Sequence, residues 1–326
     1  MAMMNIVEAV NDALRLELER DERVILLGED IGRNGGVFRA TNGLLAQFGE
    51  RRVVDTPLAE SAIVGAAVGM AARGLRPVAE IQFLGFIYEA MDQLAAQTAR
   101  LRFRSAGRFT APLVVRAPYG GGVRTPELHA DSLEGLFLHS PGLKVVMPST
   151  PYDAKGLLIA AIRDPDPVLF LEPMKLYRAF RQEVPQEDYT LEIGKASIVQ
   201  EGTDLTIITW GAAALTVKKV AQDWQETHGV SIEVIDLRTI VPLDRQTILS
   251  SVEKTERVLI VHEAVKSGGV GAEISALINE QAIYSLEAPV LRVTGYDTPY
   301  PVPMIEDDWL PNEDRIAKGI EELLAH

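Results

Sequence analysis

Residues 53–72 read VVDTPLAESAIVGAAVGMAA and join a short apolar strand to a helix of small residues. The strand ends at Thr56-Pro57, because the proline ring fixes φ and lacks the amide hydrogen that a sheet requires. The helix then begins near Glu60, the one carboxylate of this helix. A strand that delivers an acid to the start of a helix is a common way to build a site in α/β proteins. The stretch therefore predicts an α/β fold with a site near Glu60.

Two interpretations of this stretch remain open from the residues alone. Glu60 is either a functional acid or a simple helix-terminal charge, because the helix macrodipole favours negative charge at the N-terminus. Gly65 and Gly69 lie four residues apart, and such small faces let another backbone approach closely. That face packs either on the chain's own sheet or on a partner chain.

Composition indicates a soluble intracellular protein of two domains. The chain has 326 residues, 47% of them hydrophobic, and a net charge of −14. An acidic chain argues against nucleic-acid binding, which needs a basic face, but a small anion needs only local donors. There is no cysteine, which excludes disulfides, thiolate nucleophiles and cysteine-ligated metals. No signal peptide or membrane-spanning run is found, so we expect no membrane and a cytoplasmic location.

Strand and helix patterns alternate along the chain, which predicts parallel sheets with helices on both faces. We therefore expect two doubly wound α/β domains, at residues 1–172 and 196–326, joined by a linker at 173–195 that lacks a clear period. The expected strands are 24–27, 53–55, 76–82, 113–116, 143–147, 168–171, 205–209, 231–236, 258–261 and 290–293. The expected helices are 5–20, 41–48, 61–72, 86–104, 152–162, 212–228, 244–254, 268–279 and 313–324.

Polar and aromatic side chains follow four of the first-half strands. Ligands of parallel sheets bind outside the carboxyl ends of the strands. The side chains expected there are Glu29, Glu60, Gln82, Phe83, Phe86, Tyr88 and His129. The sequence therefore predicts that these groups converge at one edge of the sheet.

His129 is either a surface residue or a proton shuttle, the role that histidine serves near neutral pH. It follows Gly120-Gly121-Gly122, a loop expected to bring backbone amides close to a ligand. The five histidines are not paired at metal-ligand spacing. The motifs of P-loop proteins, dinucleotide-binding proteins and α/β-hydrolases are absent, so no phosphate cradle is recognised.

Several sequence blocks together resemble one family. They are GEDIG at 28–32, DTPLAE at 55–60, EIQFLGF at 80–86, PELH at 126–129, DSLE at 131–134, PGLKVVMPS at 141–149, IDLRT at 235–239 and SLEAPVLRV at 285–293. The chain resembles the transketolase-like β subunit of the decarboxylating component of 2-oxo acid dehydrogenase complexes. The similarity is greatest to the bacterial pyruvate dehydrogenase type and runs the whole length.

The resemblance implies a pyrimidine-binding thiamine-diphosphate domain followed by a transketolase-type C-terminal domain. In this family a partner α subunit holds the diphosphate and its magnesium with a Gly-Asp-Gly motif, which this chain lacks. Glu60 matches the glutamate that hydrogen-bonds the pyrimidine nitrogen, and Glu29, Gln82 and Phe86 are expected in the cofactor pocket. His129 matches a histidine near the substrate and the lipoyl arm.

The resemblance also implies assembly and a structural ion. Two α and two β chains would form a heterotetramer, which would bind a lipoyl-bearing acyltransferase core. The small-residue helix would then cross a subunit boundary. Some members bind potassium in the β subunit, at positions that correspond to Leu113, Ala161, Ile162, Asp164 and Asp166.

The leading hypothesis from the sequence is a pyruvate dehydrogenase β subunit that oxidatively decarboxylates pyruvate and acetylates lipoyl groups, on the route from glycolysis to acetyl-CoA. A second hypothesis is the β subunit of a branched-chain 2-oxo acid dehydrogenase or acetoin dehydrogenase. A third is a non-catalytic assembly subunit, which the presence of Glu60 and His129 argues against.

Overall fold

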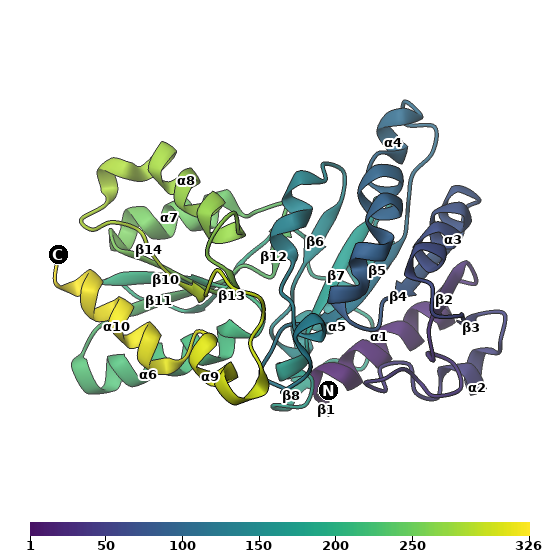
Figure 1. Cartoon of the computed structure of the whole chain (residues 1–326), viewed down its shortest axis with the longest axis horizontal. Helices are drawn as coiled ribbons and strands as arrows, with labels where there is room; N and C mark the ends of the chain where they lie inside the picture. The colour runs from purple at the N-terminus through teal and green to yellow at the C-terminus, as the bar shows by residue number, and fades with distance from the viewer.

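Two mostly parallel sheets, each flanked by helices and each with one antiparallel strand at an edge, form the body of the chain in a computed structural model that describes residues 1–326 (Figure 1). The seven-stranded sheet has the order β12-β6-β7-β5-β4-β2-β3, and the five-stranded sheet has the order β14-β13-β10-β11-β9. The strands of the first are β2 (Val24–Gly28), β3 (Val53–Asp55), β4 (Arg76–Glu80), β5 (Val114–Tyr119), β6 (Lys144–Val146), β7 (Val168–Pro173) and β12 (Thr239–Val241). Those of the second are β9 (Ser197–Gln200), β10 (Leu205–Thr209), β11 (Ile232–Asp236), β13 (Val258–Val265) and β14 (Leu291–Gly295).

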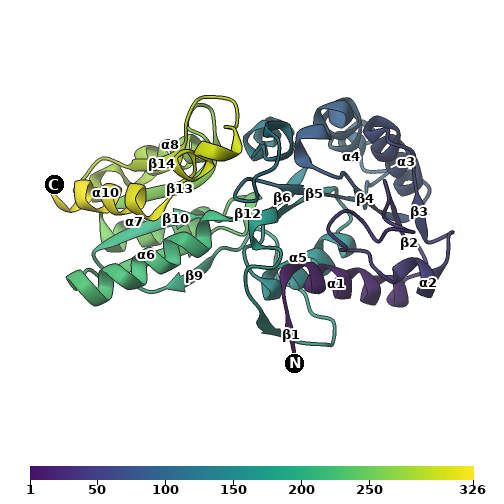
Figure 2. The same cartoon turned by 60° about the horizontal axis from the view of Figure 1, so that its bottom comes forward.

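Helices cover both faces of each sheet (Figure 2). The α-helices are α1 (Ile6–Arg20), α2 (Leu44–Phe48), α3 (Glu60–Ala72), α4 (Leu101–Arg104), α5 (Pro151–Arg163), α6 (Ala213–His228), α7 (Arg245–Thr255), α8 (Val270–Ala282), α9 (Glu306–Trp309) and α10 (Glu313–Leu324). The shorter or irregular helices are η1 (Leu84–Ala90), η2 (Asp92–Thr98), η3 (Glu127–His129), η4 (Glu134–His139), η5 (Met174–Leu176), η6 (Ile283–Ser285) and η7 (Pro303–Ile305).

Successive strand residues of the first sheet face two different hydrophobic cores. Leu26 and Val78 pack with α1 and α5, whereas their neighbours Leu27 and Ala79 pack with α3 and η1. This alternation follows from the two-residue repeat of a strand. Both faces are therefore buried, which explains the continuous apolar runs and confirms the doubly wound α/β class.

Short strands differ from the sequence prediction. β12 comes from the second half of the chain, yet it pairs antiparallel with β6 and completes the first sheet. Within the expected linker, β8 (Gln182–Val184) pairs with β1 (Ala2–Met4). These short strands lie in segments without a clear hydrophobic period, so they were not predicted from the sequence. The division into 1–172, 173–195 and 196–326 stays a prediction.

The expected single helix at 86–104 is wrong. The structure has a 3₁₀ segment, η1, then a π-helical segment, η2, and only then the short α4. Thr98 donates its hydroxyl hydrogen to the Gln93 carbonyl oxygen, five residues earlier and 2.7 Å away, as a widened turn permits. Such irregular turns are frequent where a helix borders a functional site.

The two halves are joined by buried polar contacts as well as by apolar packing. Asp236, at the end of β11, accepts a hydrogen bond from the Ser149 hydroxyl. Arg238 pairs with Asp153 of α5 at 2.9 Å. Burial raises the pKa of Asp236 to about 7. One hydrophobic cluster includes residues of both sheets, so the halves form one continuous core.

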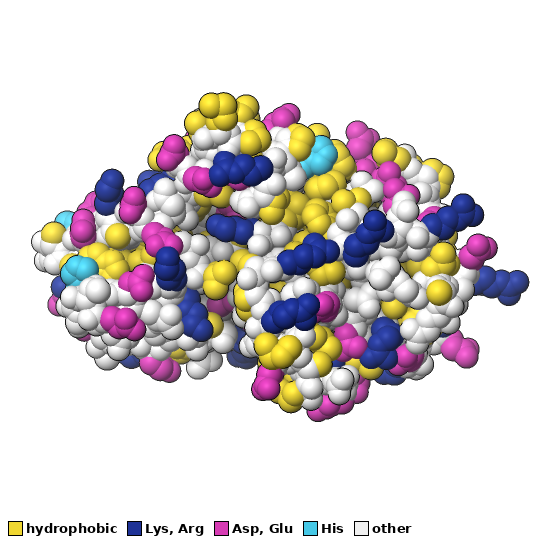
Figure 3. Space-filling view, turned by 90° about the horizontal axis from the view of Figure 1, so that it is seen from below, with side chains coloured by type: hydrophobic (Ala, Val, Ile, Leu, Met, Phe, Trp, Pro, Cys, Tyr) yellow, Lys and Arg dark blue, Asp and Glu magenta, His cyan; other side chains and the backbone are white.

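The surface mixes both signs of charge despite the acidic balance. On the face drawn in Figure 3, basic and acidic side chains are interspersed and separated by neutral atoms. Among the helices, none is both long and apolar enough to cross a membrane.

Candidate active site

The residues predicted for the site follow four neighbouring parallel strands. Glu60 follows β3, Glu29 follows β2, Gln82 and Phe86 follow β4, and His129 follows β5. These strands are adjacent in the order β3-β2-β4-β5, and all their pairings are parallel. Neighbouring strands are spaced by about 4.8 Å, so the edge spans roughly 15 Å. The structure therefore brings the predicted residues to one edge of the sheet.

Two carboxylates lie close together on this edge. Glu60 is the first residue of α3 and is only 7% exposed. Glu29 is half-buried, and its pKa is raised first by burial and then by the charges of Asp30 and Glu60. Two neighbouring negative charges disfavour each other. This edge therefore suits a carboxyl group that keeps its proton, or a ligand that donates a proton to one of the carboxylates.

Three rings form the other part of the edge. The His129 ring lies edge-on to Phe83 and Phe86, with centroid distances of 4.6 and 5.1 Å. Its Nδ1 atom is buried and has no hydrogen-bond partner. Such an atom is costly unless a ligand or a partner chain pairs with it. From the sequence, Phe83 was predicted only as one of several aromatic residues that follow β4. No sequence pattern indicated that it would contact His129.

The short helix η3, which carries His129, packs directly against η1, which carries Phe86. A Cβ atom on Gly85 would overlap the Leu128 carbonyl oxygen. Only glycine allows η1 and η3 to approach so closely. This contact fixes His129 beside Phe86.

A buried ionic network supports the edge from within the sheet. Arg116 of β5 makes a two-pronged pair with Glu172 of β7, with both distances 2.7 Å, and also pairs with Glu80 of β4. Tyr177 donates its hydroxyl hydrogen to Glu172 at 2.6 Å. Burial raises the pKa of Glu80. The partners are 36 and 56 residues from Arg116 in the chain, so the sequence did not reveal the network.

The small-residue face of α3 is exposed in the single chain. Ile63 and Ala67 face the sheet, whereas Ala66 and Gly69 face outward. No atom lies within 4 Å of a Cβ built on Gly69. Packing on the chain's own sheet is therefore the wrong interpretation of this glycine, and packing on a partner chain stays a prediction.

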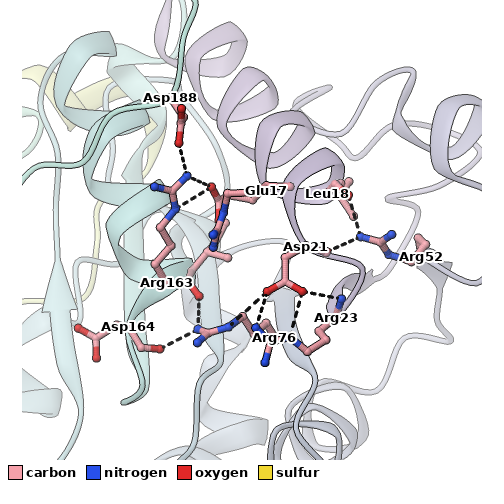
Figure 4. A network of polar contacts seen from close by, with 11 residues as sticks. Glu17, Leu18, Asp21, Arg23, Arg52, Arg76, Arg163, Asp164 and Asp188 are labelled. Atoms are coloured by element: carbon pink, nitrogen blue, oxygen red, sulfur yellow. Dashed lines mark hydrogen bonds and ion pairs between the residues drawn. The ribbon is translucent and has the colours of Figure 1, made fainter.

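Basic side chains pair with oxygen atoms of three of the five residues expected to bind potassium, and Figure 4 shows Arg76 beside Asp164. Arg76 donates to the carbonyl oxygens of Ile162 and Asp164 at 2.7 and 3.2 Å. The Asp164 carboxylate pairs with Lys144 at 2.5 Å, and the Asp166 carboxylate pairs with Arg102 at 2.6 Å. Carbonyl oxygens of Leu113 and Ala161 accept backbone hydrogen bonds. These oxygen atoms therefore already have hydrogen-bond or ion-pair partners within the chain.

Comparison with known proteins identifies the family. The Transketolase, pyrimidine binding domain family matches residues 2–179, and the Transketolase, C-terminal domain family matches residues 194–316. Proteins named pyruvate dehydrogenase E1 component subunit beta are similar throughout: the one from Bacillus subtilis (strain 168) is 59% identical over 324 residues, and that from Staphylococcus epidermidis is 58% identical. Each alignment covers 99% of both chains. The chain belongs to this family of E1 β subunits.

The fold of the family is also that of a solved structure. A chain described as split gene transketolase, inactive beta4 tetramer, superposes with a TM-score of 0.81, and 99% of each chain is covered. At 20% sequence identity this likeness shows the fold alone. The predicted order of a pyrimidine-binding domain and a transketolase-type C-terminal domain is confirmed.

Membership of the E1 β family implies thiamine diphosphate as the cofactor, and the residues present fit one end of it. The edge offers a buried acid, Glu60, and an aromatic ring, Phe86, which suit a nitrogen heterocycle. The chain has no Gly-Asp-Gly motif. No cluster of three or more acidic or histidine side chains is placed to hold a metal ion. The residues at this edge therefore suit the pyrimidine end of the cofactor.

Proposed function

We propose that this chain is the β subunit of a pyruvate dehydrogenase. With an α subunit it would decarboxylate pyruvate and transfer the acetyl group to lipoyl groups. The main support is the full-length similarity to E1 β subunits, together with an edge that has the acids and rings of a pyrimidine pocket but no diphosphate site. An active site shared with an α subunit would explain why this chain has residues suited to the pyrimidine but no recognised diphosphate-binding motif.

Residues of this chain would have different roles at the site shared with the α subunit. Thiamine diphosphate supplies the electron sink when bound. Glu60 would hold a proton at its carboxyl group against the pyrimidine nitrogen, and Glu29 and Gln82 would line the pocket. Phe86 would pack against the ring. His129 would donate a proton from its imidazole during transfer to the lipoyl group.

Assembly of the proposed enzyme would use two further contacts. We propose that the exposed small-residue face of α3 packs on a second β subunit, within a heterotetramer of two α and two β chains. The α subunit would hold the diphosphate and magnesium, and the complex would bind an acyltransferase core in the cytoplasm. Purifying the tagged chain from its native extract tests this. A stoichiometric partner with a Gly-Asp-Gly motif supports the proposal, and an active chain without a partner contradicts it.

The substrate is proposed on the names of the relatives, so the alternatives need a direct test. Branched-chain 2-oxo acid and acetoin dehydrogenases would use the same pyrimidine pocket. Rates of the assembled enzyme with pyruvate, 2-oxoisovalerate and acetoin separate them. A highest kcat/KM with pyruvate supports the proposal, and faster turnover of either other substrate overturns it. A non-catalytic assembly subunit would leave all rates unchanged when Glu60 is replaced.

Replacing His129 by alanine is expected to lower acyl transfer to lipoyl groups about 100-fold, because a positioned proton donor contributes roughly that much. Decarboxylation measured with an artificial electron acceptor should change much less. The exposed His139, ten residues further along the chain, serves as the matched control when replaced by alanine. Equal transfer rates in both variants would remove His129 from the mechanism.

Potassium binding at the five positions remains a proposal from the family resemblance. Melting temperatures in potassium and sodium chloride at equal ionic strength test it. A rise specific to potassium supports a bound ion, whereas equal values support Arg76 as the group that satisfies the Ile162 and Asp164 carbonyl oxygens.

A further inference from the structure

The loop after β5 begins with Gly120-Gly121-Gly122 and ends in the turn that carries His129. Its amides were expected to approach a ligand, but in the structure two carboxylates of the C-terminal half accept their hydrogen bonds. Gly121 donates to Glu263 of β13, and Gly122 donates to Glu306 of α9 at 3.0 Å. Two amides of the loop that was expected to approach a ligand are therefore paired within the chain itself.

The fit between this loop and the C-terminal half is tight. A Cβ atom on Gly120 would lie 3.1 Å from both carboxylate oxygens of Glu263, and one on Gly121 would overlap the Tyr300 hydroxyl. Gly120 also has a φ of +84°, which favours glycine. The glycines therefore serve close approach to the carboxylates, and the loop is held from outside its own domain.

Glu306 is the centre of this contact. It is 1% exposed, and the Tyr300 hydroxyl donates to it at 2.7 Å. Arg124, further along the loop, donates its backbone amide to the same oxygen at 3.3 Å and pairs its side chain with Asp307 at 2.6 Å. Hydrogen bonds to a charged acceptor are stronger than neutral ones, so the start of the loop is firmly placed.

The far end of the loop is fixed as well, because Leu128 sits against Gly85. The loop that carries His129 is therefore held at both ends by contacts outside it. Glu263 is buried with Glu134, Lys175 and Glu306 around it, and burial is the main reason that its pKa is raised to about 7. Burying a carboxyl group costs free energy, and buried carboxyl groups with a shifted pKa are often found at functional sites.

We propose that Glu263 and Glu306 are positioning residues, through which the C-terminal half of the chain sets the placement of His129 in the site of the N-terminal half. The proposal rests on the function proposed above for His129. It also assigns a role to the three glycines, which match no phosphate-binding motif.

The test uses the enzyme assembled with its α subunit and measures acyl transfer to lipoyl groups. Glu306→Ala should lower the kcat of transfer roughly 10- to 100-fold, as expected when a reacting group is misplaced by about 1 Å. The KM for pyruvate should stay the same. Glu306→Gln keeps an acceptor oxygen for the loop amides and should recover most of the rate. Asp308→Asn, on the same short helix and exposed, is the matched control.

A double variant separates positioning from general damage. If Glu306 acts through His129, Glu306→Ala should cause no further loss of transfer in the His129→Ala background. Losses that multiply, or a Glu306→Ala enzyme with the normal rate, overturn the inference. If the His129→Ala enzyme transfers acyl groups to lipoyl groups at the normal rate, the proposed role of His129 is wrong. The inference about Glu263 and Glu306 is then wrong as well. Should Glu306→Ala fail to assemble, Tyr300→Phe removes only one hydrogen bond to Glu306 and should still slow transfer.

Discussion

Glu60→Gln is expected to reduce decarboxylation by the assembled enzyme about 100-fold or more, since a group that holds and moves a proton contributes at least that much. Glutamine keeps the size of the side chain but cannot exchange a proton at this position. Glu60 is 7% exposed at the start of α3, so solvent cannot readily take over its role. The rate of carbon dioxide release with an artificial electron acceptor measures the effect.

Folding and binding controls accompany this variant. The exposed Glu50, which lies in the loop before β3, is replaced by glutamine as the matched control and should keep the normal rate. The melting temperature of Glu60→Gln should be close to that of the wild type, because the start of α3 has no side-chain cap hydrogen bond that the substitution could remove. Decarboxylation near the wild-type rate would leave Glu60 as a helix-terminal charge only and would contradict the proposed site.

Elements with a strong period were predictable from the sequence alone. β10 and α10 have the same bounds in the structure as in the prediction, at 205–209 and 313–324. The helix expected at 86–104 is instead η1, η2 and α4, and the start of η1 packs at Gly85 against Leu128, which lies over forty positions away. A periodic pattern reports burial, whereas local helix type here follows from tertiary contact.

The site was predictable to a similar extent and for a related reason. Once the sheet is parallel, every side chain that follows a strand reaches the same edge, so Glu29, Glu60 and His129 could be placed together. The groups that position them could not be found. Glu263 lies 142 residues from Gly121, and Glu306 lies 184 residues from Gly122, so no local pattern links them.

Arg116→Met is expected to destabilise the protein by about 3–5 kcal/mol, because removing one partner of a buried ion pair leaves uncompensated charge. Arg116 is 1% exposed and joins Glu80 and Glu172 across three strands beneath the site. Methionine fills part of the space but neutralises neither acid. Urea unfolding of wild type and variant at several pH values measures the loss.

The loss should depend on pH in one direction. Burial raises the pKa of Glu80, so the folded chain binds a proton more tightly there than the unfolded chain does. Stability from such a group falls as pH rises from its unfolded pKa towards its folded pKa. Without Arg116 the two carboxylates repel each other, so the folded pKa rises further. The loss of unfolding free energy in Arg116→Met, relative to wild type, should therefore be larger at pH 8 than at pH 5.

Two further variants test whether unpaired charge is the cause. Glu172→Gln in the Arg116→Met background removes one of the two stranded charges and should recover part of the stability. Lys219→Met breaks an exposed ion pair with Glu313 and should have no measurable effect. A deficit for Arg116→Met that is equal at all pH values, and that Glu172→Gln does not relieve, would mean that lost packing is responsible. The network would then support the site by its shape and not by its charge.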